Sequence, residues 1–212
     1  MMANATRDPL FWAALDVANK DVPGVGDFCL RCHTSAGWYG GRVVKSGFGV
    51  PNDPVKGANG CLLEGSLDAT DFSNDFSGVG CQFCHRLVPN GPNGEPTMIG
   101  NANVWLDDTE CNGTEGEPCR RGPYAYPGGF SPPHAWAQSS FHEQSTLCGS
   151  CHDVTTPITD VGALKTLKLA DGTDTSLPFP IERTYSEWKQ SSFSAAGGTT
   201  CQACHMPDSE DP

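Results

Sequence analysis

Four short segments of the chain repeat the same arrangement of reactive side chains. In each, two cysteines are separated by two residues, and a histidine directly follows the second cysteine. Together these pentads use eight of the eleven cysteines and four of the six histidines, far more than chance would place in this pattern. The pentads are CLRCH (Cys29, Cys32, His33), CQFCH (Cys81, Cys84, His85), CGSCH (Cys148, Cys151, His152) and CQACH (Cys201, Cys204, His205).

The spacing within each pentad suits one particular chemistry. Two thiols three positions apart lie on one side of a helical turn, so both can add to the vinyl groups of a single porphyrin. The adjacent imidazole can then bind the iron as its proximal axial ligand. This pattern is typical of haem c attachment, and we expect four covalently bound haems per chain. A four-thiolate zinc site, a redox dithiol or a disulfide scaffold would use the cysteines but would give the histidines no role.

A six-coordinate iron needs a second, distal ligand, and only His134 and His142 lie outside the pentads. On one continuous helix they would be about 12 Å apart, too far to bind one iron, so we expect them to bind two different haems. The other two haems then need another ligand, an open site or a ligand from a further segment. Methionine is a known axial ligand, and the candidates are Met1, Met2, Met98 and Met206.

Three cysteines lie outside the pentads. Cys111 and Cys119 bracket a short turn-rich loop, and in an oxidising compartment they are the favoured disulfide pair. Cys61 is then left over, either free, buried or linked to another chain. Two Asn-x-Thr sequons, at Asn4 and Asn112, are compatible with glycosylation or with chance.

The formal net charge of −12 argues against nucleic-acid binding, which needs a basic surface. An acidic surface suits solubility, or a basic or metal-bearing partner. No apolar run approaches the roughly 20 residues of a membrane span, and MMANATRDPL has no apolar signal region, so an exported protein would be represented here by a mature or partial chain. Three acidic residues lie close together in sequence, and we expect them to form a solvated turn rather than a calcium site: Asp107, Asp108 and Glu110.

The pentads occur in two similar pairs. Their first cysteines are 52, 67 and 53 residues apart. The flanks also match, since GDFCLRCHT resembles STLCGSCHD and GVGCQFCHR resembles GTTCQACHM. We therefore expect a single tetrahaem domain over 1–212, made of two dihaem modules at about 9–90 and 131–208 that a loop-rich connector joins.

A first helix is expected directly before the first pentad. Asp8 suits the N-cap and Pro9 the first helical position. The helix should run from 9 to about 19 and bury Leu10, Ala14 and Val17 on one face.

Regular structure is otherwise expected to be sparse. Ser131-Pro132 should open a helix that carries His134, and 184–193 should be helical with a capping box of Thr184 and Glu187. Segments 88–96 and 111–119 are rich in turn residues. The predicted fold is mostly irregular with short α-helices and little or no β-sheet. It is organised around a row of four haems, which replace a side-chain core.

The chain resembles the family of multihaem c-type cytochromes over most of its length. The resemblance is carried by GDFCLRCHTSAGW, GVGCQFCHRLVP, LCGSCHDVTTP, PIERTYSEWKQSSF and CQACHMP. It implies an electron carrier, a unit of a cell-surface haem chain or extracellular filament, or a redox enzyme. The family is usually rich in haems with two histidine ligands, and the few histidines of this chain depart from that pattern.

These observations favour electron transfer through four haems over enzymatic catalysis. We expect an exported protein, extracellular or at the cell surface, that polymerises head to tail into a nanowire-like filament and meets other redox proteins or extracellular acceptors. The stretch before Asp8, with Met1 or Met2, has no module of its own to pack on and could reach a neighbour's haem. The alternatives are a monomeric periplasmic shuttle, and an enzyme that converts a small nitrogen or sulfur compound at an open haem.

Overall fold

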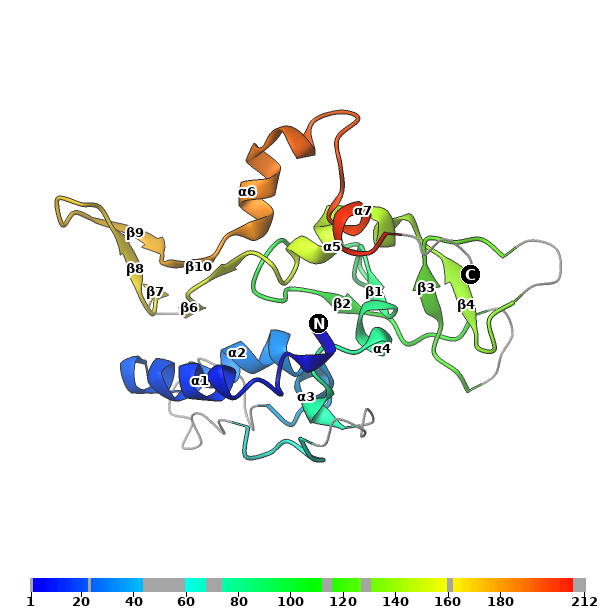
Figure 1. The fold of residues 1–212 in the computed structure, drawn as a ribbon, viewed down its shortest axis with the longest axis horizontal. Helices are drawn as coiled ribbons and strands as arrows, with labels where there is room; N and C mark the ends of the chain where they lie inside the picture. Colours follow the sequence, from blue (N-terminus) through cyan, green and yellow to red (C-terminus); the bar gives the residue numbers. More distant parts are fainter. Residues whose placement is uncertain are drawn as a thin grey trace. The chain divides into compact units, whose positions relative to one another are not determined.

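The computed structural model shows short elements joined by irregular segments (Figure 1). The helices that it describes have 3 to 13 residues, and the strands pair only two by two. The chain is therefore mainly irregular, with short helices and small sheets. Within the described ranges, no helix is both long and apolar enough to cross a membrane. The structure describes residues 2–22, 24–43, 60–67, 74–111, 116–126, 131–159 and 162–207.

The chain divides into two compact units, each built from two segments. The boundary in the first half passes between Cys84 and His85, inside the second pentad. Residue contacts and haem attachment are different criteria, so the dihaem modules expected at about 9–90 and 131–208 stay a prediction. Unit 1 comprises residues 1–84 and 157–178, and unit 2 comprises residues 85–156 and 179–212.

Unit 1 is largely helical in its first segment and contains two small hairpins in its second. β6 pairs with β7, and β8 pairs with β9, both antiparallel. The elements are η1 (Met2–Asn4), α1 (Pro9–Asp21), α2 (Gly26–His33), α3 (Ser35–Tyr39), η2 (Asp75–Ser77), α4 (Cys81–Cys84), β6 (Ile158–Thr159), β7 (Gly162–Ala163), β8 (Thr166–Lys168) and β9 (Asp174–Pro178).

Unit 2 mixes short strands with short helices. β1 pairs with β2 and β5 with β10, both antiparallel, whereas β3 and β4 are parallel. The elements are β1 (Leu87–Val88), β2 (Trp105–Leu106), β3 (Arg120–Gly122), β4 (Trp136–Gln138), η3 (Ser140–Glu143), α5 (Ser145–Gly149), β5 (Val154–Thr155), β10 (Pro180–Glu182), α6 (Thr184–Gln190), η4 (Ser192–Ser194) and α7 (Cys201–His205).

Helix α1 begins as predicted but buries the opposite face. The Asp8 carboxylate accepts a hydrogen bond from the Leu10 backbone N–H at 2.9 Å, which caps the first turn. The predicted burial of Leu10, Ala14 and Val17 is wrong: all three are exposed, Leu10 by 74% and Val17 by 58%. Leu15 is buried instead. The helix is apolar on both faces, and the face with the larger aromatic side chains is the one that packs against the rest of the unit.

The buried apolar cluster formed by the described residues of unit 1 is small. Leu15 of α1, Leu30 of α2 and Val43 form its centre, each 2% exposed or less. Four partly buried side chains pack against this centre: Phe11, Trp12, Trp38 and Leu63. Among the described residues of this unit, aromatic rings therefore cover a centre of three aliphatic side chains.

An ion pair with a buried carboxylate joins distant parts of the first segment of unit 1. The Asp75 side chain is 2% exposed and accepts two hydrogen bonds of 2.7 Å from the Arg42 guanidinium. The backbone N–H of Glu64 donates a third, at 2.9 Å. Burial alone would raise the pKa of Asp75, but the hydrogen bonds from Arg42 and Glu64 outweigh it and lower the pKa below its ordinary 3.8. The hydroxyl of Thr34 also donates to the Asp75 backbone O.

The stretch before Asp8 packs inside its own unit, contrary to expectation. The Met2 backbone O accepts a hydrogen bond from the Val79 N–H at 3.1 Å. Thr6 is fully buried, and its hydroxyl donates to the Phe76 backbone O at 2.7 Å. These contacts hold within unit 1 a segment that we expected to be available for contact with a neighbouring molecule.

Two further local expectations are corrected. Ser131-Pro132 opens no helix, because the following residues form β4, which pairs in parallel with β3. His134 and His142 therefore do not share a helix. Residues 184–190 are helical as predicted, but the capping box is wrong: Thr184 is the first helical residue, and its N–H donates to the Glu182 carboxylate at 2.9 Å.

We predict that Asp75→Ala lowers the free energy of unfolding by about 1–3 kcal/mol at neutral pH, since it removes the acceptor of two hydrogen bonds from Arg42 and leaves the Glu64 N–H without that partner. Because folding lowers the pKa of Asp75, its contribution is present above pH 3.8 and is lost as the pH falls through the folded-state value. Guanidinium unfolding followed by circular dichroism measures both effects. Asp171→Asn, in an exposed turn, is the control and should leave the midpoint unchanged; equal midpoints for the two variants would contradict the prediction.

Candidate functional site

Each pentad lies on a helical turn. The first ends α2, the second starts with α4, and the fourth is α7 itself. The third begins in α5 and continues as a turn, in which the N–H of His152 donates to the Cys148 backbone O at 2.9 Å. All eight pentad cysteines are free thiols; six are partly buried, whereas Cys81 and Cys204 are exposed. Each thiol pair is thus presented from one turn, as attachment to a porphyrin requires.

Two pentad histidines have one ring nitrogen held by the backbone. The Nδ1 of His33 lies 3.2 Å from the Ala5 backbone O, and the Nδ1 of His85 lies 2.6 Å from the Arg121 backbone O. A carbonyl oxygen only accepts, so the proton belongs on Nδ1 and the lone pair of Nε2 is left for a metal. Phe11 stacks on the His33 ring with centroids 4.2 Å apart. Both rings therefore have the tautomer that iron ligation needs.

The structure brings His142 next to the pentad histidine His85. Their ring centroids are 5.7 Å apart, and their planes differ by 11°. Two metal–nitrogen bonds of about 2 Å plus half of each ring would give a separation of about 6 Å for imidazoles that share a metal. His142 is only 9% exposed. The pair is therefore close to the spacing of two axial ligands on one iron.

The other ligand candidates lie at the surface. His134 is exposed ahead of β4, with its Nδ1 3.1 Å from the Ala135 backbone O. The exposed fractions of Met2, Met98 and Met206 are 46%, 55% and 60%. Met1 lies outside the described residues. The structure thus places one of the two predicted distal histidines beside a pentad histidine and the other described candidates at the surface.

The third and fourth pentads lie against each other in unit 2. The backbone N–H of Cys201 donates to the Ser145 hydroxyl at 3.0 Å, which joins the first turns of α7 and α5. Burial, and then the neighbouring Cys201, raise the pKa of Cys148 to about 11. The first thiols of the two pentads are therefore neighbours, and cofactors attached there would be close together.

A residue inside the third pentad fits against helix α6. Gly149 lies so close to Tyr185 that a Cβ atom at Gly149 would be 2.4 Å from Cδ2 of the Tyr185 ring. The Tyr185 N–H donates to the His152 backbone O at 2.8 Å. Trp188, whose centroid is 5.5 Å from that of Tyr185, donates from Nε1 to the Thr199 backbone O ahead of α7. Helix α6 thus connects the third pentad to the start of the fourth.

The residue after the histidine is tied to a distant segment in the first three pentads. Thr34 donates to the Asp75 backbone O at 2.5 Å, and Arg86 forms a two-pronged ion pair with Asp108. Asp153, 4% exposed, pairs with Arg183 at 2.6 Å and accepts a hydrogen bond from the Ser186 hydroxyl. These tethers fix the chain just beyond each histidine.

These contacts beyond the pentad histidines were not predicted from the sequence. The signal present there was a polar residue directly after three of the four pentads. Their partners are 22 to 41 residues away in sequence, and only the folded chain identifies them.

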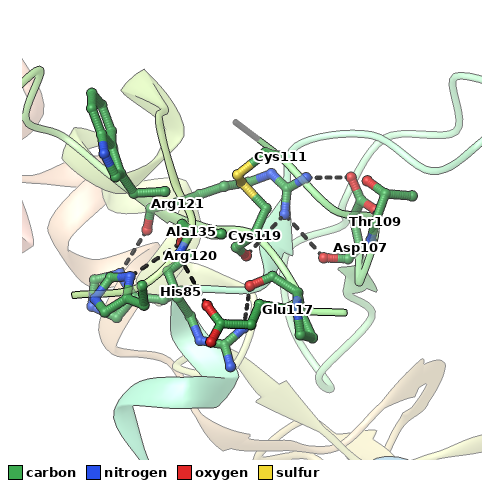
Figure 2. Close-up of a disulfide and its surroundings, with 12 residues drawn as sticks. His85, Asp107, Thr109, Cys111, Glu117, Cys119, Arg120, Arg121 and Ala135 are labelled. Atoms are coloured by element: carbon green, nitrogen blue, oxygen red, sulfur yellow. Dashed lines mark hydrogen bonds and ion pairs between the residues drawn. A yellow bond between two sulfur atoms is a disulfide. The ribbon is translucent and has the colours of Figure 1, made fainter. Parts of the chain in front are cut away.

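A disulfide and two arginines lie in the region of His85, the histidine of the second pentad (Figure 2). Cys111 and Cys119, the pair favoured by the sequence, are joined by a disulfide. Cys119 is fully buried and leads into β3, where the Arg121 backbone O contacts His85. The disulfide therefore anchors the strand that orients this histidine. Cys61 is an exposed free thiol.

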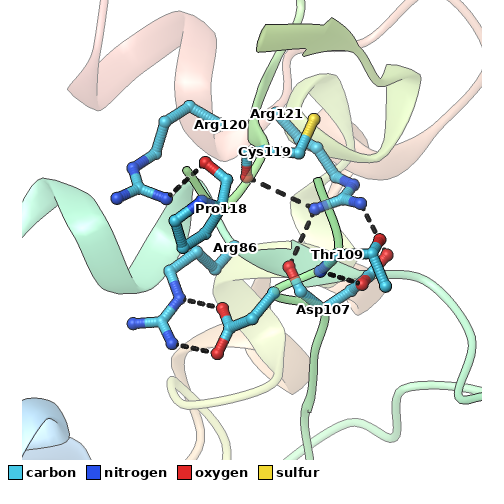
Figure 3. A network of polar contacts seen from close by, with 8 residues as sticks. Arg86, Asp107, Thr109, Pro118, Cys119, Arg120 and Arg121 are labelled. Carbon is cyan, nitrogen blue, oxygen red and sulfur yellow. Dashed lines mark hydrogen bonds and ion pairs between the residues drawn. The ribbon is translucent and has the colours of Figure 1, made fainter. Parts of the chain in front are cut away.

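The acidic residues of this region pair mostly with arginines (Figure 3). Arg121 contacts Asp107 at 2.5 Å, and the hydrogen bond from Arg86 lowers the pKa of Asp108. Glu110 accepts a hydrogen bond from the Gly116 N–H at 2.7 Å. The acidic turn thus neutralises arginines rather than directing its carboxylates at one cation. Among the residues that the structure describes, no group of three or more His, Cys, Asp or Glu could hold a metal ion.

We predict that Gly149→Ala lowers the free energy of unfolding by about 1–3 kcal/mol, because the added methyl group displaces the Tyr185 ring. Adding Tyr185→Ala should remove most of this extra cost in a double-mutant cycle measured by denaturant unfolding. Gly80→Ala, ahead of the second pentad, is the matched control, since its new Cβ would meet nothing within 4 Å. A cost at Gly149 that persists without the tyrosine ring would refute the steric explanation.

Comparisons with known proteins leave the site to be interpreted from its own geometry. No family model, no curated protein and no solved structure matches the chain. The interpretation therefore rests on four thiol pairs with adjacent imidazoles and on the histidine pair in unit 2.

Proposed function

We propose that the protein is a multihaem c-type cytochrome that transfers electrons through four covalently attached haems. The observation that carries this proposal is the fourfold repetition of C-x-x-C-H, each time on a helical turn with both thiols free. The backbone contacts to Nδ1 of His33 and His85 support it, since they leave Nε2 for an iron. A four-thiolate zinc site or a redox dithiol would leave these histidine arrangements without a purpose.

The proximal ligands in this proposal are the four pentad histidines. His142 is the distal ligand of the iron bound by His85, and the observation that supports this is their 5.7 Å ring separation. An iron held there would take its two axial nitrogens from these two imidazoles. His134 and the methionines remain candidates for the other irons. The proximal ligands are His33, His85, His152 and His205.

Electron transfer is favoured over catalysis by the way the chain is built. A bound haem supplies one-electron redox chemistry, and the protein sets its position and the identity of its axial ligands. The contact between α5 and α7 supports a close pair of haems at the third and fourth pentads, which suits rapid transfer between them. The enzyme alternative requires a haem with an open distal position. It therefore applies only to the irons for which no distal ligand has been assigned.

We propose an exported protein, in keeping with the disulfide between Cys111 and Cys119. The head-to-tail filament and the monomeric periplasmic shuttle are both compatible with a row of haems. The packing of residues 2–7 within unit 1 removes one reason for favouring the filament. Electron microscopy of the purified protein distinguishes the two assemblies.

We predict four haems per chain. Intact-mass measurement of the mature protein should show four haem additions that survive acid–acetone extraction, because thioether bonds are covalent. Replacing both cysteines of one pentad with alanine, for example Cys201 and Cys204, should remove one addition. A wild-type mass that corresponds to fewer than three haems, or the presence of stoichiometric zinc, would disprove the assignment.

We further predict that His142→Ala converts one haem per chain from low to high spin and leaves the number of attached haems unchanged. The reason is that the substitution removes the distal imidazole and leaves the proximal His85 in place. Electron paramagnetic resonance of the oxidised protein measures the conversion. His134→Ala should change a different haem or none, so an identical spectral change in both variants would contradict the pairing of His142 with His85.

A further inference from the structure

Gln202 is the second residue of the fourth pentad, and its side chain holds a segment 60 residues away. Its Nε2 donates two hydrogen bonds, to the backbone O of His142 at 3.1 Å and to that of Gln144 at 2.8 Å. Both partners are carbonyl oxygens, which only accept, so the amide nitrogen rather than the amide oxygen must face them. One side chain of the fourth pentad thus fixes the backbone that carries His142.

The segment that Gln202 holds is short, and its start is fixed separately by the Ser139 N–H, which donates to the Gly122 backbone O at 2.7 Å. His142 lies in η3, a 3₁₀ helix of four residues, and Gln144 is its C-cap. The last carbonyls of a helix have no partner within it, and 3₁₀ hydrogen bonds have poorer geometry than those of an α-helix. The Gln144 backbone O also accepts a hydrogen bond from the Leu147 N–H at 3.0 Å, so the amide of Gln202 is a second donor there and the donor to the His142 O. A contact from outside the helix therefore helps to fix the end of η3 that carries His142.

The position of Gln202 is itself well determined. The adjacent Cys201 N–H donates to the Ser145 hydroxyl, and Ser145 is 4% exposed. Thr200 caps α7 by accepting a hydrogen bond from the Ala203 N–H at 3.3 Å. The start of α7 is thus anchored on α5 immediately beside the glutamine, so the two bonds to η3 come from a fixed support.

We infer that Gln202 is a positioning residue for ligation at another haem: by fixing the backbone of His142, it sets the distance of that imidazole from His85. The inference rests on the proposed function, in which His142 and His85 bind one iron. At a ring separation of 5.7 Å, a displacement of η3 by a fraction of this distance decides whether both rings reach the same metal. The fourth pentad thereby controls axial ligation at the second.

The chain provides a matched control at the equivalent position of another pentad. Gln82 follows the first cysteine of CQFCH, as Gln202 follows that of CQACH, and the Gln82 side chain is exposed. Gln202→Glu keeps the shape of the side chain, removes both donors and places a negative charge against two carbonyl oxygens. Gln202→Lys restores donors at the same position, because one ammonium group can donate to both carbonyls.

The experiment measures carbon monoxide binding to the reduced holoprotein, since this ligand binds only after the distal ligand has left the iron. Gln202→Glu should keep four haems by mass. One haem per chain, of those that react slowly in the wild type, should bind carbon monoxide about tenfold faster than it does in the wild type. Gln202→Lys and Gln82→Glu should behave like the wild type. The reacting haem should be the one that His142→Ala opens.

The possible outcomes separate the inference from the function on which it rests. If His142→Ala opens no haem, the proposed ligation by His142 fails whatever Gln202 does. If His142→Ala opens one haem and Gln202→Glu binds carbon monoxide at the wild-type rate, the inference about Gln202 is overturned and the proposed function stands. Faster binding at several haems, an equal effect of Gln82→Glu, or loss of the fourth haem without faster binding elsewhere would also overturn it.

Discussion

The small size of the apolar core is the constraint on which the rest of the structure depends. In the part of unit 1 that the structure describes, the centre of the core consists of Leu15, Leu30 and Val43 under a few aromatic rings. Burial of so little apolar surface offsets only part of the conformational entropy that folding costs. The chain therefore relies on individual polar contacts and one disulfide to hold its irregular segments. The proposed porphyrins would add large apolar surfaces at the places where the side chains bury little apolar surface.

The polar contacts are concentrated next to the pentads. Thr34, Arg86 and Asp153 each directly follow a pentad histidine, and each is bound to a residue at least 22 positions away. A buried ion pair contributes little net stability compared with apolar packing, but it specifies one geometry, since either partner alone is costly to bury. Asp75 and Asp153, both almost fully buried, fit this role. The cross-links thus fix the backbone at the point where a proximal ligand would need a constant position.

Residues that lie between the two cysteines of a pentad also help to position neighbouring elements. Gly149 leaves space for the Tyr185 ring, and Gln202 reaches the carbonyls of the segment that carries His142. Neither residue is part of the attachment chemistry. Both connect one pentad to an element elsewhere in unit 2, so the geometry of one candidate site depends on residues of another.

The sequence by itself determined the features that act over a single turn. The C-x-x-C-H spacing, the Asp8 cap of α1 and the Cys111–Cys119 pair all depend on residues within eight positions of one another. Only the tertiary structure decided which face of α1 is buried, that β4 pairs with β3 where a helix was expected, and that His142 lies beside His85. These outcomes depend on which of several competing partners is buried. That choice is made between segments far apart in the chain, where local spacing carries no information.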